Sequence, residues 1–202
     1  MHIAQYDQMA AFASEFLTPY RGQLRTILDV GSYDVNGTHK PIFNDPMWKY
    51  VGMDMAAGPN VDLLLEEAYN WKEVPTNSFD VVVSGSLLEH VEYPWMTMIE
   101  VARVLKPGGL TCHVAPSAGF EHRFPVDCYR YYKDGFAALA NWADLEILKV
   151  FTDWGSIHRG SRDGGHVWNE SVLIARKKNT NESILRAAHM ETLLKSMNSV
   201  IK

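Results

Sequence analysis

Short apolar runs of strand length alternate with segments of helical period along the whole chain. Runs of this kind are typical of parallel strands whose crossover segments cover both faces of the sheet. The 202 residues suit one such domain, and no low-complexity linker divides them. We therefore expect one α/β domain, with an N-terminal helix over residues 1–20, a core over residues 21–178 and a helical tail over residues 179–202.

Seven runs are predicted to be strands: residues 25–30, 49–54, 61–65, 79–83, 110–115, 146–152 and 167–176. The run over residues 79–83 is rich in β-branched side chains, which favours a central place in the sheet, whereas the short run over residues 61–65 suits an edge. Helical patterns cover residues 94–106 and 134–142. The first is expected to stop at Pro107-Gly108-Gly109, because proline cannot continue the helical hydrogen bonds.

Both ends of the chain carry an amphipathic helical pattern. The N-terminal pattern reaches Leu17, and Pro19 is expected to end it. The tail from Glu182 onward places apolar side chains on one face of a helix: Met190, Leu194, Met197 and Ile201. Such a helix must dock on its own domain or on a second copy, and the second arrangement would make the protein a homodimer.

The charge and composition of the chain limit which classes of partner it can bind. The net charge is −5 at pH 7, and the longest basic run, Arg176-Lys177-Lys178, closes an apolar strand, so we expect no nucleic-acid partner. Cys112 and Cys128 lack the spacing of a metal site. The N-terminus lacks signal-peptide features and no apolar run could span a bilayer, so we expect a cytoplasmic protein with no membrane partner.

The first predicted strand leads into Asp29-Val30-Gly31, and the second ends at Asp54. A glycine at such a turn lets the backbone approach a ligand, while the acid disfavours a pyrophosphate group. Neighbouring parallel strands would place both carboxylates at one sheet edge, where Asp54 can accept hydrogen bonds from a ribose diol. The alternatives are structural, with Asp29 as a cap of the following segment and Asp54 as a turn former.

Five segments continue this pattern in order: Ile27-Leu28-Asp29-Val30-Gly31, Tyr50-Val51-Gly52-Met53-Asp54, Ser78-Phe79-Asp80-Val81-Val82, Leu88-Glu89-His90-Val91 and Arg103-Val104-Leu105-Lys106-Pro107-Gly108-Gly109. On these segments the chain resembles the class I S-adenosylmethionine-dependent methyltransferases, and within them the methyltransferase type 11 group. The resemblance implies a Rossmann-like methyltransferase fold, with a seven-stranded, mostly parallel sheet whose last strand is antiparallel and helices on both faces. It also implies S-adenosylmethionine as the cofactor.

The resemblance carries over residue by residue. It places Asp29 and Gly31 by the methionine moiety of the cofactor and Asp54 by the ribose hydroxyls. The adenine-contacting acid of the family falls on Glu66 or Glu67. The expected cofactor-binding residues are Asp29, Gly31, Ser32, Asp54, Met55, Glu67 and Ser84.

The cofactor loop departs from the family pattern at one position. Tyr33 stands where a second glycine is usual, and the next glycine is Gly37. This predicts a loop that closes further over the methionine end of the cofactor. The rival cofactor, a nicotinamide dinucleotide, expects the pattern G-x-G-x-x-G, which the chain lacks.

The acceptor site is expected in the polar and aromatic segment over residues 116–132, which follows the fifth predicted strand. His122 and Asp127 can form a histidine–carboxylate pair in which the imidazole accepts a proton. The alternative is that they only pin the loop, with Arg130 bridging to a carboxylate. His90, after the fourth predicted strand, is the second candidate base, with a packing role as its alternative.

No metal site is expected, because the set of His122, Asp127 and His166 has no recognised ligand spacing. The predicted function is methyl transfer from S-adenosylmethionine to a small-molecule or sugar acceptor, with a hydroxyl oxygen as the target. Aromatic side chains such as Trp154 offer faces on which a sugar can stack. The alternatives are a non-catalytic S-adenosylmethionine-binding accessory protein and a nicotinamide-dinucleotide oxidoreductase.

Overall fold

The computed structural model describes residues 3–154 and 168–200, and its centre is a seven-stranded sheet. The strands are β1 (Arg25–Val30), β2 (Trp48–Asp54), β3 (Leu63–Leu64), β4 (Phe79–Gly85), β5 (Leu105–Pro116), β6 (Leu145–Thr152) and β7 (Glu170–Lys177). Their order is β3-β2-β1-β4-β5-β7-β6, and β7 runs antiparallel to both of its neighbours. The predicted mostly parallel sheet with an antiparallel last strand is confirmed.

The most buried strand lies in the centre of the sheet, and the shortest strand lies at its edge. β4 lies between β1 and β5, and its Val81, Val82 and Val83 are all buried. A strand covered on both faces carries an unbroken apolar run, because neither side of it meets water. β3 ends the sheet beside β2 and is only two residues long. The predicted central and edge strands are therefore both confirmed.

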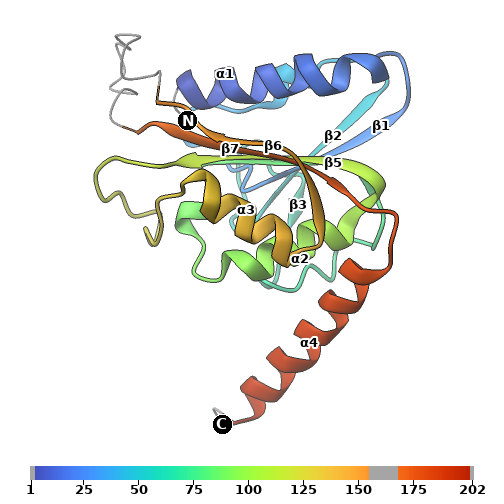
Figure 1. Cartoon of the computed structure of the whole chain (residues 1–202), viewed down its shortest axis with the longest axis vertical. Helices are drawn as coiled ribbons and strands as arrows, with labels where there is room; N and C mark the ends of the chain where they lie inside the picture. The colour runs from blue at the N-terminus through green and yellow to red at the C-terminus, as the bar shows by residue number, and fades with distance from the viewer. Residues whose placement is uncertain (1–2, 155–167, 201–202) are drawn as a thin grey trace.

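Helices cover both faces of the sheet (Figure 1). On one face lies α1 (Ile3–Phe12), whose Met9 and Phe12 pack in one core with Ile27 of β1. On the other lie α2 (Pro94–Val104) and α3 (Lys133–Trp142), which contribute Met98 and Phe136 to a second core. The sheet is thus the middle of three layers, and both of its faces are buried.

Two helix ends differ from the prediction. The helix predicted to reach Lys106 ends at Val104, and the chain continues directly into β5 at Leu105. Leu105 is fully buried and pairs with Phe79 of β4, so strand β5 begins five residues before the expected start at Leu110. At the N-terminus the α-helix ends at Phe12, and a π-helical turn over residues 13–17 completes the predicted segment.

The connection from β1 to β2 contains no α-helix, although parallel neighbours are usually joined by one. Residues 31–47 hold a single 3-10 helix, Lys40–Ile42, and Phe43 after it packs in the core that α1 covers. The residues after Gly31 therefore follow the edge of the sheet instead of turning into a helix.

The C-terminal helix α4 (Glu182–Val200) extends away from the sheet (Figure 1). It contacts α2 near its start, where Ala187 is buried, whereas Leu193 farther along is exposed. Of the predicted apolar face, the side chains of Leu194 and Met197 and all of Ile201 lie outside the described residues. A homodimer formed through α4 stays a prediction.

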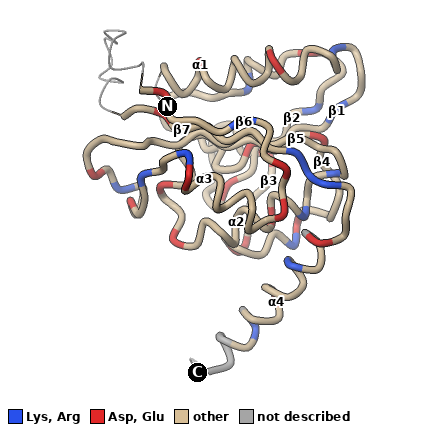
Figure 2. The backbone as a smooth tube through the Cα atoms, viewed as in Figure 1, with Lys and Arg blue, Asp and Glu red and all other residues tan. Residues whose placement is uncertain are grey.

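Acidic and basic residues are interspersed along the described chain (Figure 2). Within that part of the chain, no helix combines the length and the apolar character that crossing a membrane requires.

Candidate active site

The carboxyl ends of β1, β2, β4 and β5 meet at one edge of the sheet, because these four strands are parallel neighbours. In sheets of this type, ligands bind beyond the carboxyl ends of the strands. The residues predicted to bind the cofactor or to take part in catalysis lie at or just after these ends, with Glu67 following β3.

Asp29 is buried in a polar network on the face of the sheet that α1 covers. Its Oδ2 accepts a hydrogen bond from the Tyr50 hydroxyl at 2.5 Å and lies 3.5 Å from Nδ1 of His39. Asn60 donates to the Tyr50 hydroxyl at 3.0 Å. Burial and the neighbouring Asp29 carboxylate raise the pKa of Tyr50, so the phenol keeps its proton and remains a donor. Asp29 is thus held in place by side chains at the point where the sequence places the methionine moiety.

Asp54 ends β2 as a half-buried carboxylate. Its Oδ2 accepts the backbone N–H of Tyr33 at 3.1 Å, and its Oδ1 accepts the backbone N–H of Ala56 at 3.0 Å. An ionised carboxylate has about four acceptor sites, so these two bonds leave it able to accept more. Met55 beside it is 49% exposed. Asp54 is therefore oriented by the backbone and still available to a diol.

Tyr33, the residue in place of the expected glycine, lies over Gly58. A Cβ on Gly58 would stand 2.1 Å from Cε2 of the Tyr33 ring. Ser32 before it is buried, and its hydroxyl donates to the Asn60 carbonyl at 2.9 Å. Gly31 has a φ of +75°, a conformation that glycine adopts without strain. The cofactor loop is thus fixed by contacts with residues 58–60 instead of by a second glycine.

Two predicted cofactor residues have other partners. The Ser84 hydroxyl is bonded to Nδ1 of His113 at 2.7 Å and is buried, and Nε2 of His113 meets the Thr111 hydroxyl at 2.7 Å. Burial lowers the pKa of His113 to about 3, so this imidazole is neutral at pH 7 and is tied into the sheet by its two hydrogen bonds. Glu67 is exposed and forms an ion pair with Lys72. Contacts of Ser84 and Glu67 with a cofactor stay predictions.

Sequence reasoning missed Gln5, which reaches this edge from α1. Its side chain is fully buried, and its Nε2 has no hydrogen-bond partner in the described structure. That nitrogen lies over Gly85 at the end of β4, where an added Cβ would be 2.0 Å away. An unpaired buried donor costs about 1–3 kcal/mol, so this amide suits a ligand that carries an acceptor. The carboxylate of S-adenosylmethionine is such an acceptor, and Asp29 nearby suits its ammonium group, so the residues present fit this cofactor.

The loop after β5 is fixed by Arg130. Its two terminal nitrogens donate to the Asp127 carboxylate, Nη1 to Oδ1 at 2.6 Å and Nη2 to Oδ2 at 2.8 Å. Nη2 also donates to the Phe120 carbonyl at 2.6 Å. Asp127 accepts the backbone N–H of His122 at 2.7 Å, and its Oδ2 lies 3.4 Å from Nδ1 of that residue. The structure thus brings His122 close to Asp127 and also has Arg130 bridging to that carboxylate, and a catalytic role of the His122–Asp127 pair stays a prediction.

His90 approaches His122 from the segment after β4. The two ring centroids are 4.9 Å apart in an edge-to-face arrangement, and His122 also meets the Trp168 ring at 4.6 Å. Nδ1 of His90 donates to the Val126 carbonyl at 2.6 Å, which joins this segment to the loop after β5. Burial lowers the pKa of His90, so its imidazole is neutral at pH 7.

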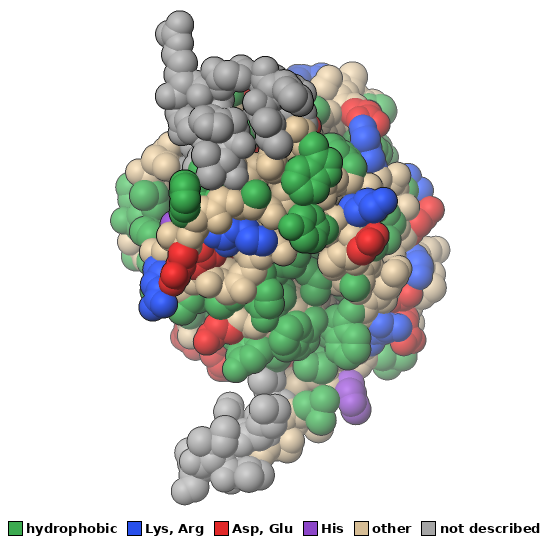
Figure 3. All heavy atoms as spheres, turned by 60° about the vertical axis from the view of Figure 1, so that its left-hand side comes forward, with side chains coloured by type: hydrophobic (Ala, Val, Ile, Leu, Met, Phe, Trp, Pro, Cys, Tyr) green, Lys and Arg blue, Asp and Glu red, His purple; other side chains and the backbone are tan. Residues whose placement is uncertain are grey.

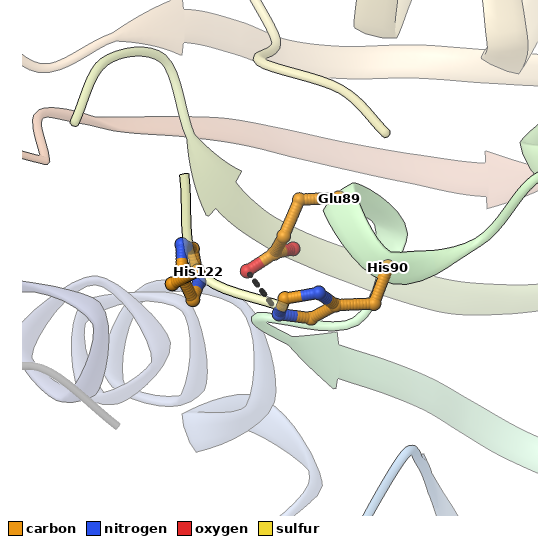
Figure 4. A group of neighbouring side chains, drawn as sticks. All are labelled: Glu89, His90 and His122. Atoms are coloured by element: carbon orange, nitrogen blue, oxygen red, sulfur yellow. Dashed lines mark ion pairs between the residues drawn. The ribbon is translucent and has the colours of Figure 1, made fainter. Parts of the chain in front are cut away.

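Glu89 points into the space beside these two imidazoles, as Figure 4 shows. Its side chain is fully buried, and neither carboxylate oxygen has a hydrogen-bond partner in the described structure. Burial raises the pKa of Glu89 to about 8. Glu89 directly precedes His90 in the chain, and this adjacency is the signal in the sequence that could have indicated the acid. His166, the third residue of the set from which no metal site is expected, lies outside the described residues.

A cavity of about 500 Å³ lies elsewhere in the described structure. It is lined by α2, the first half of α4 and residues 69–76, and none of the predicted site residues contributes to it.

Comparison with known proteins agrees with this geometry. Residues 39–112 match a family model described as a methyltransferase domain. An uncharacterized methyltransferase of Mycobacterium tuberculosis is 31% identical over 112 residues, which is 48% of this chain and 43% of that protein. The chain therefore spans less than half the length of this curated relative.

Solved structures share the fold. Phosphoethanolamine N-methyltransferase 2 of Haemonchus contortus, in complex with S-adenosyl-L-methionine, gives a TM-score of 0.64 at 14% identity and covers 86% of this chain and 53% of its own. The 1,6-didemethyltoxoflavin-N1-methyltransferase of Burkholderia thailandensis, with S-adenosylhomocysteine bound, gives 0.63 at 14% identity over 87% of this chain and 79% of its own. The chain therefore has the fold of these methyltransferases, residues 39–112 match the methyltransferase domain, and the residues at this sheet edge fit S-adenosylmethionine.

Proposed function

We propose that this protein is an enzyme that transfers the methyl group of S-adenosylmethionine to a hydroxyl oxygen of a small-molecule or sugar acceptor. The observation that carries the proposal is the pair of imidazoles of His90 and His122, 4.9 Å apart, at the sheet edge where the cofactor residues lie. A hydroxyl is a poor nucleophile until its proton is removed, so a site with groups that can remove it suits an oxygen acceptor.

The bound cofactor would supply a methyl group on a sulfonium, which is already a strong electrophile. What remains for the protein is to align the acceptor with the methyl group, at about 3–3.5 Å, and to remove the acceptor proton. Asp54, Asp29 and Gln5 would hold the cofactor through its ribose and amino-acid groups. The groups after β4 and β5 would face the acceptor.

His122 is the residue assigned to the acceptor proton. Its side chain is 35% exposed, so an acceptor can reach it from solvent. Asp127 beside its Nδ1 orients the ring and favours a proton on that nitrogen, which leaves Nε2 as the basic atom. Asp127 acts through His122 and is a positioning residue.

Exposed aromatic side chains at this edge support a sugar-like acceptor. Tyr132 and Trp154 are both more than half exposed, and their ring centroids are 6.0 Å apart. Asp153, next to Trp154, donates its backbone N–H to the Glu170 carbonyl, which places the pair by the start of β7. Figure 3 shows apolar side chains spread among charged ones on the face that it presents. Flat apolar rings beside a polar site are the surfaces on which sugar rings stack.

Turnover tests this function. We expect tag-free protein to release S-adenosylhomocysteine when supplied with S-adenosylmethionine and an acceptor from a panel of sugars, phenols and amines, with hydroxyl acceptors preferred. His122→Asn should lower kcat by about 10²–10⁴-fold, the usual contribution of a positioned acid or base. His189→Asn, an exposed histidine on α4, is the matched control and should leave kcat unchanged.

Other outcomes would decide against the proposal. Cofactor binding with no turnover on any acceptor would favour an accessory protein that binds S-adenosylmethionine without catalysis. Turnover confined to amines would move the target atom from oxygen to nitrogen. Equal kcat for the wild type and His122→Asn would return His122 to a structural role.

A further inference from the structure

We propose that Glu89, His90 and His122 form a binding site for one divalent transition-metal ion, with Zn²⁺ as the best-suited ion. The three side chains come from two segments, residues 88–90 after β4 and the loop after β5, and converge at the edge of the sheet (Figure 4). Each offers one ligand atom, and these atoms all lie within 4.8 Å of one another.

The distances suit closure around a small cation. Nε2 of His90 lies 3.7 Å from Oε1 of Glu89. Tetrahedral Zn²⁺ with bonds of about 2.0–2.2 Å sets its ligand atoms about 3.3 Å apart. The three ligand atoms would therefore approach one another by at most about 1.5 Å, which side-chain rotation can supply.

His90 is already held in the form that binds a metal. Its Nδ1 donates to the Val126 carbonyl at 2.6 Å, so the ring proton sits on Nδ1 and the lone pair sits on Nε2. Nε2 is the atom that faces Glu89. A metal-binding histidine commonly donates its other nitrogen to a carbonyl or a carboxylate in this way.

His122 has the same arrangement on the opposite side. The polar partners of its ring lie at Nδ1, which is 3.4 Å from Asp127 Oδ2, 3.3 Å from the Phe120 carbonyl and 3.4 Å from a terminal nitrogen of Arg130. Nε2 is thus left for a ligand. Because the His122 side chain is 35% exposed, an ion can reach the site from solvent.

Glu89 supplies an independent argument. It is fully buried, and both of its carboxylate oxygens lack a hydrogen-bond partner in the described structure. An uncompensated buried carboxylate is costly, and a bound cation removes that cost. The charged groups around it are Arg130, Asp127 and Glu170, and Arg130 is already neutralised by its two bonds to Asp127. Arg130 therefore does not compete with a bound cation for the Glu89 carboxylate.

The ligand types select the ion. Two imidazole nitrogens and one carboxylate oxygen suit Zn²⁺, and Fe²⁺ second, whereas Mg²⁺ and Ca²⁺ prefer oxygen ligands alone. Three protein ligands leave a fourth position open, as in zinc sites that take part in reactions.

The open position gives the ion a use that rests on the proposed function. An acceptor hydroxyl bound to the ion would lose its proton to solvent near neutral pH, because the cation stabilises the alkoxide. A His122 whose Nε2 binds the ion cannot also accept that proton. The acceptor hydroxyl is thus deprotonated either by the His122 imidazole, when no ion is bound, or through coordination to the ion, when one is bound.

Calorimetry on tag-free, chelator-treated protein tests the site, with ZnCl₂ as the titrant and MnCl₂ and MgCl₂ as comparisons. We expect one equivalent of Zn²⁺ to bind more tightly than Mn²⁺, and Mg²⁺ not to compete. Glu89→Gln and His122→Asn should each weaken Zn²⁺ binding by more than about 100-fold, beyond the roughly 10–100-fold that the loss of an outer partner causes. Glu121→Gln, which changes an exposed carboxylate of the same loop that pairs with Arg123, should bind Zn²⁺ like the wild type.

Two further measurements distinguish the loss of the metal site from a folding defect and from a failure of the proposed function. A thermal melt of each variant without metal first shows whether the variant folds. If Glu89→Gln does not fold, His122→Asn, which lies on an exposed loop, is used to test the site. Binding is measured without S-adenosylmethionine, so a protein with no methyltransferase activity can still bind Zn²⁺, and an active one can fail to. No saturable Zn²⁺ binding, or equal affinity in the wild type, Glu89→Gln and His122→Asn, would overturn the site.

Discussion

Arg130 binds the carboxylate of Asp127 through both terminal nitrogens, at 2.6 Å from Oδ1 and 2.8 Å from Oδ2. The same carboxylate accepts the backbone N–H of His122 at 2.7 Å. The side chain of Asp127 is 2% exposed. This bidentate pair is therefore shielded from water and is stronger than a surface ion pair. It fixes the loop that carries His122 over the carboxyl ends of the strands.

Asp127→Asn should therefore destabilise the protein by about 2–3 kcal/mol, because one partner of a buried charge-assisted pair is removed. Chemical denaturation at pH 7 measures the change in unfolding free energy. Glu121→Gln in the same loop is the control, since Glu121 pairs with Arg123 on the exposed surface and should change stability by less than about 0.5 kcal/mol. An Asp127→Asn protein as stable as the wild type would show that the pair does not hold the loop.

The pair also sets a pH dependence. The Arg130 guanidinium holds the pKa of the Asp127 carboxyl well below its usual range. A group with a lowered folded pKa stabilises the fold above its unfolded pKa, about 3.9 for Asp, and loses that effect as the pH falls further. The stability difference between the wild type and Asp127→Asn should thus stay constant from pH 7 to about pH 4.5 and shrink below pH 4. A difference that already shrinks near pH 6 would contradict this assignment.

The sequence was sufficient to predict the sheet, because buried parallel strands carry long apolar runs that need no knowledge of their neighbours. It located Asp29 and Asp54 at the strand ends for the same reason. It did not locate Gln5, whose role depends on how α1 crosses the sheet. It also missed Glu89 as a partner of His90 and His122, because the loop after β5 returns to residues 88–90 only in three dimensions.

The contact between Tyr33 and Gly58 gives a second prediction. Gly58→Ala should displace the Tyr33 ring, since the new Cβ would lie 2.1 Å from it, and should disturb the Tyr33 N–H bond to Asp54. We expect S-adenosylmethionine to bind about tenfold more weakly, a loss of about 1.4 kcal/mol. Calorimetry measures this affinity.

Gly135→Ala is the matched control for that substitution. Its added Cβ would meet only the Tyr131 ring, at 3.8 Å, and the residue lies in helix α3. Alanine is favoured over glycine in a helix by about 1 kcal/mol, so this variant should be slightly more stable and bind the cofactor normally. Equal losses of affinity in both variants would show that the Tyr33–Gly58 contact is not specific.

Glu170 predicts a pH-dependent gain in stability. Its side chain is buried at the start of β7, and burial raises its pKa to about 7. A carboxyl whose pKa is higher in the folded than in the unfolded state does not change the free energy of unfolding at a pH where both states are protonated. Above about pH 4.5 it lowers that free energy, and the effect is complete above pH 7. Glu170→Gln should thus be more stable than the wild type at pH 8, by up to about 3 kcal/mol, and equal to it near pH 4.5.

Thermal melts across this pH range measure the effect. Glu146→Gln, at a half-exposed carboxylate 3.6 Å from Arg176, should show no such pH dependence. A Glu170→Gln protein that is less stable than the wild type at pH 8 would mean that the charged carboxylate has a stabilising partner.

The C-terminal helix gives a prediction about assembly. α4 extends from the domain with Leu185 and Leu193 exposed, which is a cost to a monomer in water. We expect the protein to sediment as a homodimer and Leu193→Glu to shift it toward the monomer. Analytical ultracentrifugation over a range of concentrations measures this. A wild type that stays monomeric at every concentration would remove the homodimer.

The most direct test of the whole account is a calorimetric titration of S-adenosylmethionine into the wild type, Asp54→Asn and Asp80→Asn. Asp54 is oriented at the carboxyl end of β2, whereas Asp80 bonds Thr26 and Lys106 at the amino end of β4. We predict one equivalent bound by the wild type, affinity at least about tenfold lower for Asp54→Asn, and wild-type affinity for Asp80→Asn. A wild type that binds no S-adenosylmethionine, or an Asp54→Asn protein with full affinity, would contradict the cofactor site described for this protein.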